Sequence, residues 1–133
     1  SGLDFDEAVN LQIPLNLSKI GRYQTQYYGG KEFDPVITTG PTVLIPIALI
    51  FEIFGVGVIK ARSIMTLYFL IFLISLYLYS KVFFNNSSLM IFLLLILILV
   101  IPGIFYDSLH VFGEIPALTY FFLGLITFRK KIT

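Results

Sequence analysis

The hydrophobic positions of this chain follow a helical pattern near the amino terminus and form long unbroken runs in the second half. Between residues 5 and 19, apolar side chains recur every three or four positions, as on one face of a helix. Asp4 precedes this run and Glu7 follows three residues later, which is close to a capping box. We therefore predict one amphipathic helix over residues 5–19, with Asp4 at its start.

Residues 42–59 form a second, ambiguous apolar segment. Its length approaches the roughly 20 residues that a membrane crossing requires. However, Pro46 and two glycines interrupt it, and a carboxylate such as Glu52 is costly at the centre of a bilayer. A helix at the membrane interface, or a re-entrant one, is at least as well supported as a span.

Three further apolar runs predict transmembrane helices. The first carries no charge until Lys81, and the second is almost entirely Leu, Ile and Phe until Pro102. The third is weaker, because His110 and Glu114 lie in its first half. The predicted transmembrane helices cover residues 63–84, 89–106 and 109–128.

The composition supports a membrane protein. The chain is 57% hydrophobic and 13% charged, whereas soluble domains carry about 25% charged residues. A net charge of +1 without a basic patch argues against nucleic acid as a partner, and the absence of cysteine excludes disulfides and thiolate metal sites. We predict an all-α polytopic membrane protein, with amphipathic juxtamembrane helices in residues 1–62 and about three transmembrane helices in residues 63–133.

The distribution of basic residues gives the expected orientation. If residues 42–59 lie on the surface, Lys81 and the run Arg129–Lys131 share the cytoplasmic side, and residues 1–62 are extracytoplasmic. If they span, the side of the terminal run inverts. We expect the first arrangement, because it places Lys81 and the terminal basic run on the same side. The first residues do not resemble a signal peptide and there is no initiator Met, so we treat the chain as a fragment of a longer parent protein.

Adjacent carboxylates at Asp6 and Glu7 are the first candidate for chemistry. A carboxylate beside an apolar surface can accept a proton from the hydroxyl of an acceptor substrate. Acidic residues in the first turn of a helix also interact favourably with the helix dipole and need no further role. Taken locally, this structural explanation is the better supported one.

A second candidate is the set Asp107, His110 and Glu114. Spacings of three and four residues place all three on one face if the segment is helical. Carboxylates and an imidazole could hold a divalent cation, which would suit a phosphate-bearing substrate. The alternative is a solvated loop between two spans, with Asp107 capping the next helix.

Lys60 and Arg62 are basic residues at the mouth of the first clear span. Their side chains could form charge-assisted bonds with a lipid phosphate. The commoner fate of such residues is to extend to the membrane interface without a specific ligand.

Several short segments, in this order, resemble the amino-terminal part of polytopic GT-C glycosyltransferases. The likeness is greatest to the protein O-mannosyltransferases and the lipid A aminoarabinose transferases. The matching segments are Asp6-Glu7-Ala8, Gly40-Pro41, Pro46-Ile47-Ala48-Leu49, Phe54-Gly55, Ala61-Arg62 and Gly113-Glu114-Ile115-Pro116-Ala117. Together they extend over nearly the whole chain.

The resemblance implies transfer of a sugar from a polyprenyl-phosphate donor to a protein or lipid acceptor on the extracytoplasmic face. It makes Asp6 the leading catalytic carboxylate beside Glu7, and places Glu114 near the donor phosphate or a cation. Where aminoarabinose transferases have Glu-Lys-Pro, linked to metal binding, this chain has Thr39-Gly40-Pro41, so a metal bound by that route is not expected. The parent enzymes are several times longer, and we expect this fragment alone to be inactive. The rival hypothesis is a non-catalytic membrane subunit for interaction or assembly.

Overall fold

The computed structural model describes residues 3–26, 32 and 37–130, and the side chains within them up to residue 128. The described residues are mostly helical and contain no strand, apart from an isolated antiparallel bridge between Gln24 and Glu32. The prediction of an all-helical chain is therefore confirmed. The expected cytoplasmic run Arg129–Lys131 lies outside the described side chains. The helices are α1 (Phe5–Asn10), α2 (Gln12–Ile20), α3 (Pro41–Phe54), α4 (Val58–Phe83), α5 (Ser88–Val100), α6 (Pro102–Leu109) and α7 (Glu114–Lys130).

The first helical segment is divided at Leu11 into α1 and α2, where we predicted one continuous helix over residues 5–19. Pro14 explains the division. A proline has no N–H to donate to the carbonyl of Asn10 four residues earlier, and its ring clashes with that carbonyl in a regular helix. Gly21, in the left-handed conformation with φ 67°, ends α2.

Helix α3 packs with α2 and the first turns of α4 to form the main hydrophobic core. At 14 residues it is about 21 Å long, shorter than the roughly 30 Å of a bilayer's hydrocarbon core. Glu52 is exposed on its outer side. The buried residues of this core are Ile13, Val43, Leu44, Ile47, Phe51, Ala61, Met65 and Val111. We call helices α1–α3, with this core, the amino-terminal module.

Helix α4, with 26 residues, is long and apolar enough to cross a membrane. In the described part of the chain, α4 is the only single helix that meets this criterion. If the bent pair α5 and α6 is counted as one span, two segments meet it. The segment predicted as one helix over residues 89–106 is divided near Ile101, with a bend of 68°. Pro102, at the first position of α6, accounts for the division. The apolar part of α7, Glu114–Phe128, falls below the length of a span.

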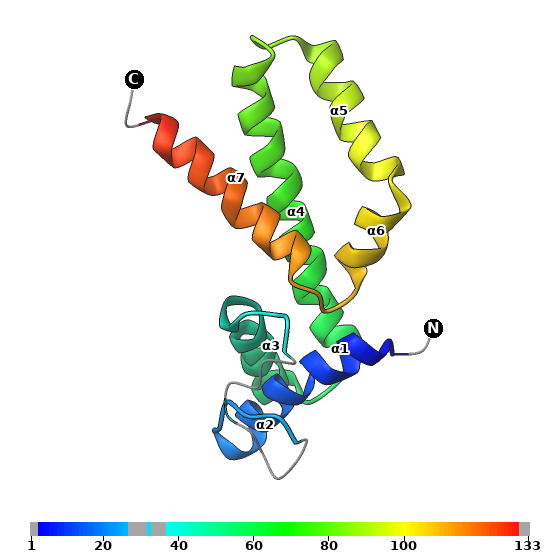
Figure 1. Ribbon diagram of the computed structural model, residues 1–133, viewed down its shortest axis with the longest axis vertical. Helices are drawn as coiled ribbons and strands as arrows, with labels where there is room; N and C mark the ends of the chain where they lie inside the picture. The colour runs from blue at the N-terminus through cyan, green and yellow to red at the C-terminus, as the bar shows by residue number, and fades with distance from the viewer. Residues whose placement is uncertain (1–2, 27–31, 33–36, 131–133) are drawn as a thin grey trace.

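The amino-terminal module and the α4–α5 turn lie at opposite ends of α4 (Figure 1). Helix α7 packs along α4, and a second core forms there from Phe69, Phe72, Leu76 and Ile115. Helix α5 diverges from α4, and α6 brings the chain back to the base of α4 (Figure 1). This return path places the α6–α7 turn beside the amino-terminal module.

Candidate functional site

The neighbouring carboxylates Asp6 and Glu7 lie in opposite environments. Successive residues of a helix point about 100° apart, so α1 presents Asp6 to solvent and turns Glu7 inward. The side chain of Glu7 is 0% exposed. Asp6 makes no hydrogen bond or ion pair within the described part of the chain, which leaves its carboxylate open to a ligand.

Arg62, in the first turns of α4, binds the buried carboxylate of Glu7 with two parallel bonds. Its Nε donates to Oε1 at 2.9 Å and its Nη2 donates to Oε2 at 2.6 Å. This bidentate geometry is the strongest form of a carboxylate–guanidinium pair. The Arg62 side chain remains 19% exposed, so the pair lies at the edge of the protein interior.

The same carboxylate connects the amino-terminal module to the α6–α7 turn. The backbone N–H of Val111 donates to Oε1 of Glu7 at 3.3 Å, and Nδ2 of Asn10 donates to the Val111 carbonyl at 2.9 Å. Helix α1, the start of α4 and the α6–α7 turn therefore meet at one buried polar cluster. Because Glu114 begins α7 just after this turn, the fold brings the Asp6 and Glu114 segments to the same end of the molecule.

Asp4 contacts α6 instead of capping α1 with its side chain. It has the extended conformation of an N-cap residue, but its carboxylate forms no cap bond. It accepts a hydrogen bond from the hydroxyl of Tyr106, and the Nε2 atom of His110 lies 4.0 Å from Oδ2. The capping box predicted with Glu7 is therefore not formed: Asp4 contacts Tyr106, and Glu7 binds Arg62.

The three candidate metal ligands do not share one helix face. Asp107 lies in α6, His110 follows the end of that helix, and Glu114 begins α7. The Nδ1 atom of His110 lies 2.8 Å from the Tyr106 carbonyl oxygen, and its ring stacks on that of Tyr106 with the centroids 4.1 Å apart. Among the described residues, no group of three or more His, Asp and Glu side chains is placed to hold a metal ion.

Glu114 lines an open cavity of about 400 Å³ between the segment before α3 and the start of α7. Three residues that carry hydroxyl groups also border it, namely Thr38, Thr42 and Tyr120. The two walls approach closely at Gly113, where an added Cβ would lie 3.4 Å from the Thr38 carbonyl oxygen. These polar residues share the lining with the apolar side chains of Val43, Pro116 and Ala117. The wall is therefore amphipathic, and its carboxylate and hydroxyls are groups that can hydrogen-bond to a sugar. Asp6 is not among the residues that line this cavity.

Both basic residues assigned to a lipid phosphate have partners within the chain. The Lys60 amine donates to the carbonyls of Phe54 and Gly55, at 3.0 Å for Gly55, and so satisfies the carboxyl end of α3. Arg62 holds Glu7 as described above. The geometry therefore gives these two side chains structural roles in joining the amino-terminal module to α4.

Sequence reasoning missed the residues that assemble this cluster, namely Asn10, Tyr106 and Val111. All three act through contacts between segments about a hundred positions apart, and no local pattern marks such contacts. No protein-family model, curated protein or solved structure matches the chain. An interpretation of its function therefore rests on the residues and their geometry.

Proposed function

We propose that this chain is the amino-terminal part of a GT-C type membrane glycosyltransferase. The enzyme would transfer a sugar from a polyprenyl-phosphate donor to a protein or lipid acceptor on the extracytoplasmic face. The observation that carries the proposal is the difference in environment between the two adjacent carboxylates, of which Asp6 is exposed and Glu7 is buried. Glu7 is locked in a buried ion pair with Arg62, and this pair holds α1 so that the adjacent Asp6 is presented to solvent.

In the proposed reaction Asp6 is the general base. It takes the proton from the acceptor hydroxyl, whose oxygen attacks the anomeric carbon of the donor sugar. The bond between that carbon and the phosphate oxygen breaks, and polyprenyl phosphate leaves with the bonding electrons. Attack from the side opposite the leaving group inverts the anomeric centre. Glu7 and Arg62 act as positioning residues in this scheme.

The cavity beside Glu114 is the proposed place of the donor. Its hydroxyl groups can hydrogen-bond to a sugar or a phosphate, since each is both donor and acceptor. A divalent cation, if the parent enzyme uses one, would bind Glu114 and take further ligands from the donor phosphate. Sugar transfer measured with and without a chelator decides whether that ion takes part.

The proposal places the chain in the membrane as a multi-pass protein, with residues 1–62 on the extracytoplasmic side. Helix α4 would cross the bilayer away from the amino-terminal module. Helix α5 carries several exposed apolar side chains, among them Leu89, Phe92, Leu93 and Leu97. This exposure supports a position of α5 in contact with lipid or with further helices.

The test is sugar transfer by membranes that contain the parent protein, with a panel of polyprenyl-phosphate donors labelled in the sugar. Asp6→Asn should abolish transfer, because the amide cannot accept the proton. Glu52→Gln is the matched control: it removes an exposed carboxylate from α3 and should leave the rate unchanged. Normal turnover by the Asp6→Asn protein would overturn the assignment of this residue.

The rival function, a non-catalytic assembly subunit, is favoured by the same exposed apolar surface of α5, which partner helices could cover. It predicts no sugar transfer with any donor, together with normal complex assembly after the changes Asp6→Asn and Glu114→Gln. Measuring assembly and transfer on the same variants separates the two proposals.

A further inference from the structure

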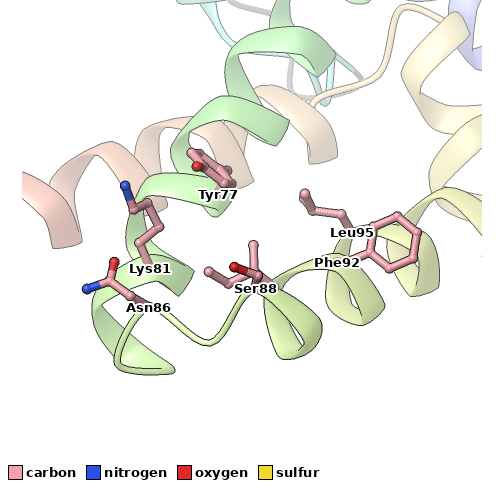
Figure 2. Close-up of a pocket in the computed structure, with 7 residues that line it drawn as sticks. Tyr77, Lys81, Asn86, Ser88, Phe92 and Leu95 are labelled. Carbon is pink, nitrogen blue, oxygen red and sulfur yellow. The ribbon is translucent and has the colours of Figure 1, made fainter.

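A second open cavity, of about 460 Å³, lies between α4 and α5 (Figure 2). This end of α4 lies away from the amino-terminal module (Figure 1). Its volume is within the range of small-ligand sites, roughly 300–1,000 Å³. The residues that line it come from the last turns of α4, the α4–α5 turn and the first turns of α5. None of these residues takes part in the site described above.

The lining of this cavity is amphipathic. Polar groups are supplied by the amine of Lys81, the amide of Asn86 and the hydroxyl of Ser88, while the wall along α5 is apolar. Figure 2 shows the amine of Lys81 and the amide of Asn86 on the same side of the turn. The apolar wall consists of Ile91, Phe92 and Leu95.

The turn between the helices holds these polar groups together. Asn85 and Asn86 both adopt positive φ, at 49° and 61°, a conformation that residues other than glycine rarely take. The backbone N–H of Asn86 donates to the Lys81 carbonyl at 2.8 Å and thereby fixes the two residues relative to each other. The Lys81 amine also lies 5.8 Å from the centre of the Tyr77 ring, a favourable cation–π distance.

We propose that this cavity binds the phosphate of an anionic membrane phospholipid, with one acyl chain along the apolar wall of α5. The position of Lys81 in α4 carries the argument. It lies about 35 Å along the helix from Val58, which is slightly more than the roughly 30 Å thickness of the hydrocarbon core. If the amino-terminal module rests at one interface, the amine of Lys81 reaches the headgroup layer of the other.

Charge and shape both select this ligand. A single cation beside an amide and a hydroxyl complements one phosphate diester, and the adjoining apolar wall complements a hydrocarbon chain. A free phosphate would use the polar groups alone and leave the wall exposed to water. The inference does not depend on the proposed glycosyltransferase activity, because it involves neither Asp6 nor a sugar.

The experiment places the purified protein in lipid nanodiscs and varies the fraction of phosphatidylglycerol or of phosphatidylcholine. Binding is measured as the rise in the protein's thermal unfolding temperature with the fraction of each lipid. Phosphatidylglycerol should stabilise the protein at a lower fraction than phosphatidylcholine does. Lys81→Gln should weaken this binding about five-fold, as expected for one basic residue near an anionic surface. Asn86→Gly should also weaken it, since glycine keeps the positive φ of the turn and removes only the amide side chain.

Lys19→Gln is the matched control, because Lys19 is an exposed residue of the amino-terminal module and the net charge changes equally. The site is supported if the Lys19 variant keeps its preference for phosphatidylglycerol over phosphatidylcholine while the Lys81 and Asn86 variants lose it. An equal loss in the Lys19 variant would show general charge attraction and overturn it. The proposal also fails if the wild-type protein does not distinguish the two lipids, or if inorganic phosphate alone reproduces the stabilisation.

Discussion

The pair of Glu7 and Arg62 gives the sharpest prediction about the architecture. We consider three variants: Arg62→Met, Glu7→Gln and the double change. Arg62→Met leaves the fully buried carboxylate of Glu7 without its guanidinium partner. Glu7→Gln leaves an arginine that is already 19% exposed and can turn toward water. The two single changes should therefore differ, although they break the same ion pair.

The magnitudes follow from this asymmetry. Leaving one charge of a buried pair unmatched typically costs about 3–5 kcal/mol, and we expect about 3 kcal/mol for Arg62→Met. Glu7→Gln should cost about 1.5 kcal/mol, because the amide oxygen of Gln can still accept the Val111 N–H. The double variant contains no buried charge and should lose about 2 kcal/mol, so the two changes are coupled by about 2.5 kcal/mol.

The absence of cysteine provides the assay. Ala61 is fully buried where α4 meets the amino-terminal module, so an Ala61→Cys background should react with a maleimide only when this interface opens. Arg62→Met should then accelerate labelling roughly a hundred-fold. The exposed Arg22 provides the control, and Arg22→Met should leave the rate unchanged. Equal effects of the two single variants, or strictly additive effects in the double variant, would refute the reasoning.

Two other changes test contacts of the same interface with the same labelling assay. Asn10→Ala removes the bond to the buried Val111 carbonyl and should lower the free energy of opening by about 1–3 kcal/mol. An unchanged labelling rate would mean that this bond does not hold the α6–α7 turn. Lys60→Gln weakens the interaction with the carboxyl end of α3 and should have a smaller effect, about 0.3–1 kcal/mol, that shrinks further at high salt; a salt-independent loss would point to packing by the lysine stem instead.

The parts of the fold that could be predicted from the sequence are those set by local pattern. Helical content followed from hydrophobic periodicity. The ambiguous segment at residues 42–59 became α3, which ends at Phe54, and the following glycines separate it from α4. Pro14 and Pro102 each divide a segment whose hydrophobic pattern predicts one continuous helix.

The candidate site was less predictable, because its residues are joined by contacts over long sequence separations. The acidic first turn of α1 has the local signature of a capped helix, yet Asp4 bonds to Tyr106 and Glu7 to Arg62. Both partners lie far along the chain, and local propensity carries no information about them. Lys60 differs, because its amine donates to the Gly55 carbonyl only five residues away at the end of α3; a contact between Lys60 and a lipid phosphate stays a prediction.

The geometry of α1 also separates two ways in which a pair of carboxylates can serve an enzyme. If both Asp6 and Glu7 acted on the substrate, both would need access to it, and each substitution should reduce turnover without altering stability. Glu7 is fully buried and its two oxygens accept bonds from Arg62 and Val111, so it has no face open to a ligand. Under the proposed reaction, Asp6→Asn should therefore abolish turnover and leave the labelling of Ala61→Cys unchanged. Glu7→Gln should accelerate this labelling, and it should reduce turnover only to the extent that it displaces α1. A Glu7→Gln protein with wild-type labelling and no turnover would mean that Glu7 itself takes part in the chemistry.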